Sequence, residues 1–303
     1  MPNTDTLYVV TCIFNPENYK SRYKLFYDFE AYLNKFNNVE LYTVELAFED
    51  QNFVVTCDGH PNHIQLRTNN ALWYKENLLN IGIKNLPVGA KYIAWIDADI
   101  HFIEDDWAEK TIEALKNTPI VQMFKTANDL GPDSEIMNKN KSFIYKWLNN
   151  ESSIKDRGRS GLAWAATREA LDNLGLLIDW GIIGSGDWFM AFALTDLLSD
   201  NDLKQKTGGY STDALDIWYD KCKQHINKNV GYVDITLEHN FHGSKKDRGY
   251  NWRWKILSEN KFNPLTDLDY DEQGLIQLKA NKPQLLEDIK NYFKSRNEDS
   301  TEK

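Results

Sequence analysis

The segment from Tyr92 to Asp99 constrains the fold more than any other part of the chain. Five apolar residues lead directly into two acids, Asp97 and Asp99, separated by Ala98. An uninterrupted apolar run is typical of a strand buried on both faces of a parallel sheet. Such a strand delivers the residues after it to the carboxyl edge of the sheet, where ligands bind in α/β folds. Because side chains alternate along an extended chain, the two acids are expected to face one divalent cation or one ribose, although acid pairs also serve as turn caps.

Composition indicates an ordinary globular protein of enzyme size. The 303 residues are 42% hydrophobic and 13% aromatic, enough for one large α/β domain or two small ones. The first six residues lack the pattern of a signal peptide, and no run approaches the roughly 18 apolar residues of a membrane span, so we expect a cytoplasmic protein with no membrane partner. The three cysteines are far apart and are expected to be reduced thiols. A net charge of -10 disfavours non-specific binding to nucleic acid.

Strand and helix patterns alternate along the first 125 residues. The strands are expected at 7–14, 39–48, 53–57, 92–97 and 120–124, and the helices at 25–36, 70–85 and 106–116. From 126 to 160 the pattern weakens into polar residues around one short helix at 143–148, which is typical of a functional loop. A strand of small residues then leads into a helix that begins at Thr167 and ends at Gly175, and a further helix is expected at 188–198.

Two later segments add chemical groups to the acid pair. In the first, Asp187 directly follows the glycine-rich turn 184–186 and begins an apolar helix. An acid in this position either complements the positive end of the helix or acts as a base. The second segment, 238–253, combines His239 and His242 with four cationic side chains, a set that suits a diphosphate.

Together these motifs resemble those of the GT-A class of nucleotide-sugar glycosyltransferases. The resemblance covers about 7–253 and rests on a DxD motif at Asp97 and Asp99, a Gly-Gly-Glu-Asp-like turn at 184–187, and a late His-Gly motif at His242. It implies an α/β fold of the GT-A, Rossmann-like type, with a mostly parallel central sheet flanked by helices. The expected catalytic domain is 1–254, with a nucleotide-binding half at about 1–125 and an acceptor-side half at about 126–254. A C-terminal helical extension with a frayed tail would occupy 255–303.

The resemblance also implies roles for individual residues. The first acid of the DxD motif would meet the ribose and the second a divalent ion, Mn²⁺ or Mg²⁺, so the implied metal ligands are Asp97, Asp99 and His242, with His239 less favoured. Asp187 would be the catalytic base. The implied contacts to the nucleotide sugar are Asn15, Arg67, Lys75, Asn80, Asp97, Lys245, Arg248, Tyr250 and Arg253. Trp164 and Trp188 lie close in sequence to these motifs, and their aromatic rings could contact the acceptor.

The implied reaction is transfer of a hexosyl or pentosyl group from a nucleotide sugar, here a UDP-sugar, to an acceptor hydroxyl. Inversion with Asp187 as base is the expectation. Gly186 departs from this pattern, because inverting relatives often have Glu in its place, so retention of configuration stays open. The acceptor is a glycan, a small molecule or a hydroxylated DNA base. The basic segment 155–159 favours a DNA acceptor, whereas the negative net charge of the chain disfavours one.

Two other classes of protein share some of these features. A nucleotidyltransferase also uses paired acids and a metal, but its Gly-rich activation loop with Arg and Lys is missing after the first strand, where Asn15-Pro16-Glu17-Asn18 stands. A non-catalytic module that binds nucleotide sugars would not need Asp187 beside a metal site.

Overall fold

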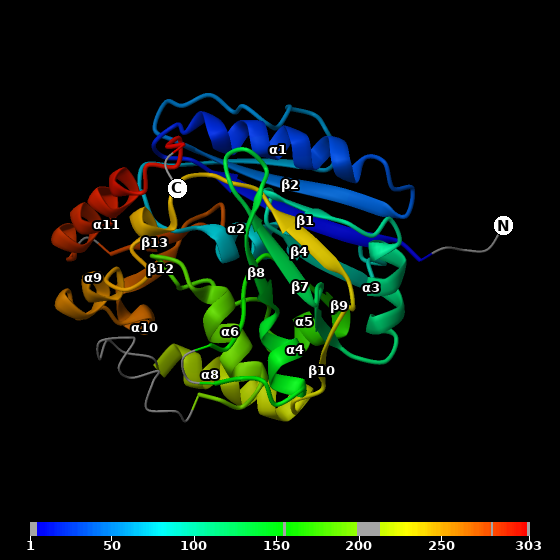
Figure 1. The fold of residues 1–303 in the computed structure, drawn as a ribbon. Coiled ribbons are helices and arrows are strands. Elements are labelled where there is room, and N and C mark those ends of the chain that lie inside the picture. The colour runs from blue at the N-terminus through cyan, green and yellow to red at the C-terminus, as the bar shows by residue number, and fades with distance from the viewer. Residues whose placement is uncertain (1–4, 154–155, 199–212, 280, 302–303) are drawn as a thin grey trace.

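The computed structural model describes residues 5–153, 156–198, 213–279 and 281–301 (Figure 1). Its centre is a seven-stranded sheet with the order β10-β6-β9-β4-β1-β2-β3. Strand β9 pairs antiparallel with β4 and β6, and the other pairings in this sheet are parallel. The predicted fold class, α/β with a mostly parallel central sheet flanked by helices, is therefore confirmed.

Most elements lie where the sequence pattern places them. The strands of the central sheet are β1 (Leu7–Phe14), β2 (Val39–Phe48), β3 (His63–Thr68), β4 (Tyr92–Ile96), β6 (Ile120–Gln122), β9 (Ala163–Thr167) and β10 (Val230–Tyr232). The α-helices described before residue 222 are α1 (Lys20–Leu33), α2 (Lys75–Lys84), α3 (Trp107–Leu115), α4 (Phe143–Leu148), α5 (Arg168–Leu174), α6 (Gly186–Leu194) and α8 (Asp213–Lys221). The C-terminal part contains α9 (Trp254–Glu259), α10 (Pro264–Asp267), β12 (Leu268–Tyr270), β13 (Ile276–Leu278) and α11 (Pro283–Ser295).

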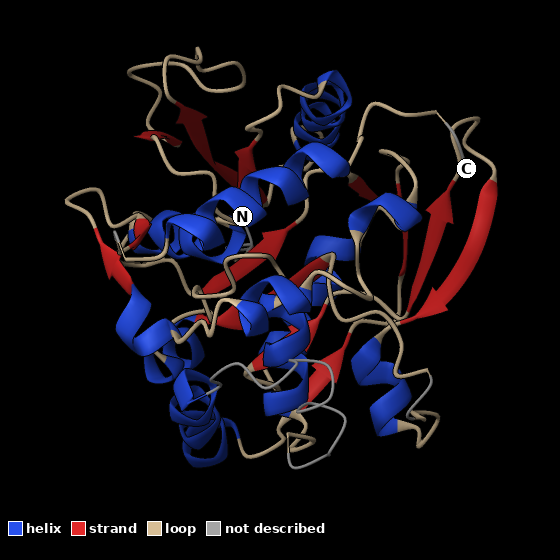
Figure 2. Ribbon diagram, turned by 90° about the vertical axis from the view of Figure 1, so that its left-hand side faces the viewer, coloured by secondary structure: helices blue, strands red, loops and turns tan. Residues whose placement is uncertain are grey.

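Neighbouring residues of the central strands point into two different cores, one on each face of the sheet. Val9 and Ala94 pack with side chains of α1 and α3, whereas Val10 and Trp95 pack with side chains of α2, α5 and α6. The second view shows helices on both sides of the central strands (Figure 2). Burial on both faces explains why these strands have continuous apolar sequences.

The strand predicted at 53–57 is wrong. This segment is a loop that wraps around the buried carboxylate of Glu45, which projects from β2. Glu45 Oε1 accepts the N–H of Val54 at 2.6 Å, and Glu45 Oε2 accepts the N–H of Thr56 at 2.8 Å. A side chain therefore satisfies the backbone donors that a neighbouring strand would otherwise satisfy, and β3 takes the place beside β2.

The loop predicted between 126 and 160 is in large part a β-hairpin. Strands β7 (Thr126–Leu130) and β8 (Ile136–Lys141) pair antiparallel and belong to a second sheet with the order β5-β11-β7-β8. The other strands of this sheet are β5 (Ile100–Phe102) and β11 (Thr236–His239). The first four residues of β8 are exposed, so the strand lacks the apolar alternation by which a sequence reveals strands.

Helix ends follow local capping signals with small differences. Thr167 accepts the N–H of Ala170 at 3.2 Å, and Gly175 ends α5 with a φ of 74°, as predicted. Helix α6 begins at Gly186 and ends at Leu194, slightly ahead of the predicted 188–198. Helix α2 begins at Lys75 and not at the predicted residue 70.

Lys155 of the basic segment 155–159 lies outside the described residues.

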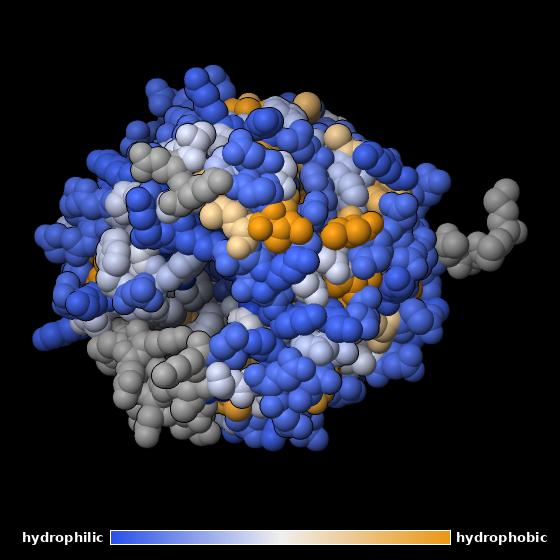
Figure 3. All heavy atoms as spheres, viewed as in Figure 1, coloured by the Kyte–Doolittle hydropathy of each residue, from blue (hydrophilic) through white to orange (hydrophobic). Residues whose placement is uncertain are grey.

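The molecular surface is mostly polar on the face drawn in Figure 3, where hydrophobic patches are small and separate. Within the described ranges, no helix has the length and apolar character needed to cross a membrane. The sequence predicts a frayed tail after about residue 295, and this prediction is wrong as far as Glu298, because Arg296 and Glu298 are 4% and 5% exposed. The C-terminal segment thus packs against the body of the protein.

Candidate active site

The segment that carries Asp97 and Asp99 lies where β4 meets the start of β9. Ile96 pairs with Ala163, and the N–H of Asp97 donates to the carbonyl of Leu162 at 2.8 Å. Because β9 runs antiparallel to β4, its first residues and the loop before them lie at the carboxyl end of β4. This pairing brings the loop around Gly161 to the same sheet edge as the two acids.

The second sheet places His239 beside Asp99. In the antiparallel pairing of β5 and β11, His239 lies opposite Ile100, and the N–H of Asn240 donates to the carbonyl of Asp99 at 2.8 Å. In the parallel pairing of β11 and β7, His239 lies opposite Asp129. The two strand pairings together place the imidazole ring of His239 between the carboxylates of Asp99 and Asp129.

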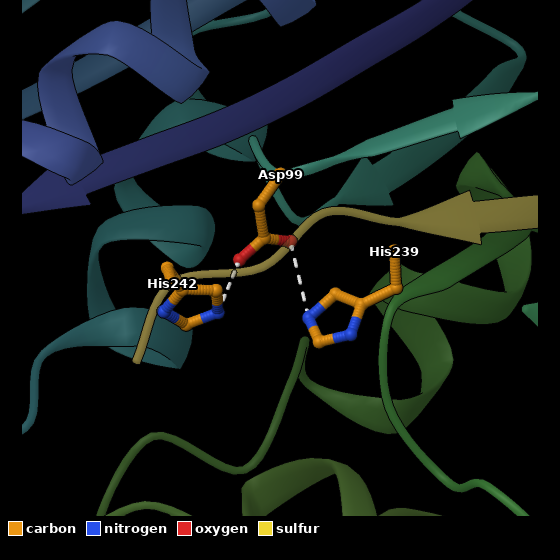
Figure 4. A group of neighbouring side chains, drawn as sticks. All are labelled: Asp99, His239 and His242. Carbon is orange, nitrogen blue, oxygen red and sulfur yellow. Dashed lines mark ion pairs between the residues drawn. The ribbon is translucent and has the colours of Figure 1, made fainter. Parts of the chain in front are cut away.

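Asp99, His239 and His242 form a buried cluster at the carboxyl edge. The imidazole rings approach different oxygens of one carboxylate (Figure 4): His242 Nε2 lies 3.0 Å from Asp99 Oδ2, and His239 Nε2 lies 3.9 Å from Asp99 Oδ1. Their potential ligand atoms lie within 4.8 Å of one another. The sequence favoured His242 over His239 as a ligand, whereas the structure brings both rings to the same carboxylate.

The donor atoms of this cluster fit a divalent cation. Asp99 Oδ1 is buried and has no hydrogen-bond partner among the described residues. His239 donates from Nδ1 to Asp129, which leaves the lone pair of Nε2 facing Asp99. Burial lowers the pKa of His239 to about 4, against the raising effect of both carboxylates, so the ring is neutral. Burial acts to raise the pKa of Asp99, but the two histidines outweigh it and keep this pKa low. One carboxylate and two imidazole rings are ligand types that Mn²⁺ and related cations accept.

Asp129 holds His239 in this orientation. Its Oδ1 lies 3.0 Å from His239 Nδ1, and its Oδ2 accepts from Asn140 at 2.7 Å and from Lys245 at 2.5 Å; Arg159 also forms an ion pair with it. Burial opposes ionisation of Asp129, but its partners outweigh this effect and lower its pKa. A carboxylate behind a ligating imidazole is a common way of fixing the tautomer and orientation of the ring. Lys245, expected at the diphosphate, thus contacts Asp129.

The C-terminal segment supports the second histidine. Glu298 Oε2 lies 3.4 Å from His242 Nδ1 and 3.4 Å from an Arg22 nitrogen, and Glu298 Oε1 accepts from Arg296 at 2.6 Å. Gly243 makes this approach feasible: its φ is 85°, and a Cβ there would lie 2.8 Å from the carbonyl oxygen of Asn297. The glycine of the His-Gly motif therefore has a steric role, which only the folded chain reveals.

A cavity of about 640 Å³ opens beside the cluster. The predicted site residues that line it are Lys75, Asp97, Asp99, Asp187, Trp188, His242, Arg248, Tyr250 and Arg253. Further lining residues that were not among the expected site residues include Arg22, Glu76, Arg159 and Arg296. The acids, the histidines and most of the basic residues expected at the site therefore share one cavity.

Besides Lys245, three other residues expected to contact the nucleotide lie outside the cavity lining. The side chain of Asn15 bonds the backbone of Tyr19, accepting its N–H at 3.0 Å and donating to its carbonyl at 2.9 Å. Arg67 donates to backbone carbonyls of the loop after β2. Asn80 bonds both backbone groups of Leu177, at 2.9 and 3.0 Å. Each of these side chains fixes a turn or a loop.

The two tryptophans expected near the acceptor lie in different environments. Trp164 is 2% exposed, stacks with Trp95 at a centroid distance of 6.5 Å and donates its indole N–H to the carbonyl of Ser160 at 2.7 Å. Trp188 lines the cavity and is partly exposed. Of the two rings, the structure places only Trp188 where a ligand in the cavity can touch it.

Asp97 pairs with Lys75 in the cavity lining. Lys75 Nζ lies 2.5 Å from Asp97 Oδ1. Burial acts to lower the pKa of Lys75, but the nearby carboxyl groups of Asp97, Asp187 and Glu76 outweigh it and raise this pKa. Burial also raises the pKa of Asp97, against the effect of Lys75. Asp97 is therefore held by an ammonium group, while Asp99 belongs to the histidine cluster.

Asp187 lies in the first turn of α6 and lines the cavity. Its Oδ1 accepts the N–H of Trp188 at 2.8 Å, which fixes one oxygen of the carboxylate. A Cβ at Gly161 would overlap Asp187 Oδ2, so the glycine leaves room for this side chain beside the loop that precedes β9. The turn and the strand loop thus meet at the Asp187 carboxylate.

Arginine side chains form the basic side of the cavity lining. Arg248 Nη1 lies 3.4 Å from the hydroxyl of Tyr250, and the guanidinium of Arg253 lies 5.0 Å from the centre of the Tyr250 ring. The guanidinium of Arg296 lies 4.9 Å from the Trp73 ring. Burial of the Tyr250 hydroxyl acts to raise its pKa, but the arginines outweigh this effect and lower it. A group of guanidiniums that stabilises a phenolate can also bind phosphate oxygens.

No protein-family model and no curated protein matches this chain. Among solved structures, it is similar to the catalytic domain of Drosophila β1,4-galactosyltransferase 7 in complex with xylobiose, with a TM-score of 0.44 and 11% identity over 93% of this chain and 98% of that chain. It is also similar to S. aureus TarS 1-349 in complex with UDP-GlcNAc, with a TM-score of 0.44 and 9% identity over 95% of this chain and 72% of that chain. Likenesses this distant assign neither a family nor a function.

Proposed function

We propose that this protein is a metal-dependent glycosyltransferase of the GT-A type, which transfers a hexosyl or pentosyl group from a UDP-sugar to an acceptor hydroxyl. The observation that carries the proposal is the meeting of three groups in one cavity: the Asp99, His239 and His242 cluster, a set of arginines, and Asp187. A nucleotide-sugar transferase needs a cation site, an anion site and a base within reach of one substrate.

Leaving-group stabilisation is the first task of such a site. Asp99, His239 and His242 would hold Mn²⁺ or Mg²⁺, which as a Lewis acid stabilises developing phosphate charge by several kcal/mol. Asp97 would contact the ribose from its place beside Lys75. Arg248 and Arg253 lie on the basic side of the cavity and would bind phosphate oxygens with charge-assisted hydrogen bonds.

Activation of the acceptor is the second task. In our proposal Asp187 accepts the proton of the attacking hydroxyl, and the product has the anomeric configuration opposite to that of the donor. A positioned carboxylate contributes about 10² to 10⁴-fold to such a step. Trp188 follows Asp187 at the cavity wall and would contact the acceptor, which is a glycan, a small molecule or a hydroxylated DNA base.

The direct test is release of UDP from a panel of UDP-sugars, measured with Mn²⁺, with Mg²⁺ and with excess EDTA. The assay is repeated with candidate glycans and with hydroxymethylated DNA. We expect metal-dependent UDP release and transfer of the sugar to one acceptor class. Transfer of the nucleotide with release of pyrophosphate would identify a nucleotidyltransferase instead, and tight binding without any turnover would identify a binding module.

A further inference from the structure

Glu76 is a buried acid that the proposed mechanism does not use. It lies in the first turn of α2, next to Lys75, and is 3% exposed while lining the cavity. Its carboxyl group accepts a hydrogen bond from the backbone N–H of Glu76 itself, and among the described residues no group of another residue donates one to it. Burying a carboxyl group without such a partner is costly, so a ligand in the cavity is the natural source of one.

The position of this carboxyl group is set by Gly186. Gly186 is the first residue of α6, and its φ is not in the left-handed region, so the backbone would allow a side chain there. A Cβ at this position would, however, lie 2.6 Å from Cδ and 2.7 Å from Oε1 of Glu76. The Glu76 carboxyl group, which comes from α2, therefore fills the space that a side chain of the turn before Asp187 would occupy.

The surroundings of Glu76 favour its neutral form. Burial raises the pKa of Glu76 to about 8; the charge of Lys75 opposes this, and the charge of Asp187 adds to it. A protonated carboxyl group can donate one hydrogen bond and accept another. A sugar hydroxyl offers the same combination, so the two groups are complementary.

We propose that Glu76 is a specificity-determining residue that binds a hydroxyl of the sugar being transferred. The assignment rests on the proposed function and on the neighbours of Glu76. Glu76 follows Lys75, which pairs with Asp97 at the expected ribose, and its carboxyl group contacts Gly186, the residue before the expected base Asp187. All of these residues except Gly186 line the cavity, so a donor sugar held between Asp97 and Asp187 would be within reach of Glu76.

The test compares the affinity for UDP-sugars with the affinity for UDP in three proteins, all with Mn²⁺. Glu76→Met keeps the side-chain volume but removes both hydrogen-bonding functions, and Glu76→Gln keeps them. We expect Glu76→Met to bind the preferred UDP-sugar about 10 to 100-fold more weakly, the range of a hydrogen bond to a buried polar partner, and UDP with wild-type affinity. The affinity of Glu76→Gln for the UDP-sugar should lie between that of the wild type and that of Glu76→Met.

A carboxyl group moved back to the turn provides an independent check. In the double variant Glu76→Ala/Gly186→Asp, the first substitution removes the carboxyl group on α2 and the second places a carboxyl group in the same space from α6. The double variant should therefore prefer the UDP-sugar over UDP more strongly than Glu76→Ala does. If the wild type releases UDP from UDP-sugars but Glu76→Met has the same UDP-sugar affinity, the role assigned to Glu76 is wrong. If the wild type neither binds nor turns over any UDP-sugar, the proposed function itself is wrong.

Discussion

His239 and Asp129 face each other across the parallel pairing of β11 and β7, with 3.0 Å between Nδ1 and Oδ1. This contact keeps the second ring nitrogen of His239 available to a cation beside Asp99. We therefore expect Asp129→Asn to lower the affinity for Mn²⁺ about 10 to 100-fold, the range found for partners of ligating histidines. Asp234→Asn is the control, because Asp234 forms a surface ion pair with Lys125. Equal Mn²⁺ affinity in both variants would contradict the account of Asp129.

Replacing Asp187 by Asn tests the base. The substitution keeps the shape of the side chain but removes its capacity to accept a proton, so kcat should fall about 10² to 10⁴-fold while UDP-sugar affinity stays close to that of the wild type. Asp172→Asn on the exposed surface of α5 should leave kcat unchanged. NMR of the product should show inversion at the anomeric carbon. Retained configuration, or lost donor binding with normal turnover, would exclude Asp187 as the base.

The variant Arg248→Ala tests whether the arginines of the cavity bind the nucleotide. Arg248→Ala should weaken UDP binding by about 1.5 to 3 kcal/mol, the scale of hydrogen bonds to charged groups. Since Arg248 Nη2 also lies 3.0 Å from His242 Nε2, Mn²⁺ affinity is measured separately to isolate the effect on the nucleotide. Arg67→Ala removes a guanidinium that donates to backbone carbonyls outside the cavity lining, and UDP affinity should not change. Similar losses in the two variants would argue against a specific anion site.

The variant Gly243→Ala tests whether the C-terminal segment around Asn297 and Glu298 packs against Gly243. Gly243→Ala introduces a Cβ at a φ of 85° and within 3 Å of the backbone of Asn297 and Glu298, so we expect a loss of stability of about 1 to 3 kcal/mol. Gly175→Ala is a matched control, because its φ is 74° but the new Cβ meets only the flexible end of Lys221. Thermal unfolding should show the larger loss for Gly243→Ala. A smaller loss than for Gly175→Ala would mean that the C-terminal segment is not held as described.

The parts of the fold that were predictable from sequence are those with local signals. The apolar run of β4 and the caps of α5 each depend on residues within one element, and the structure has both as expected. The hairpin β7–β8 was missed because β8 exposes most of its side chains, and the strand predicted at 53–57 failed because a single carboxylate, that of Glu45, replaces a strand partner.

The candidate site was predictable only where its residues belong to a motif. Asp97, Asp99, Asp187 and His242 stand in recognisable patterns, and all four line the same cavity. Asp129 reaches His239 through strand pairing across 110 positions of the chain, and Glu298 reaches His242 through the packing of the last helix. No local pattern marks such partners, because their roles depend on sheet register and on the path of the C-terminal segment.

The central claim is that Asp99, His239 and His242 bind a divalent cation. Calorimetric titration of the metal-free protein with Mn²⁺, without nucleotide, measures this directly. We predict one site per chain in the wild type, loss of that site in Asp99→Ala, and strongly weakened binding in both His239→Ala and His242→Ala, with each variant folded by circular dichroism. Mn²⁺ binding of wild-type strength in folded Asp99→Ala would contradict the claim.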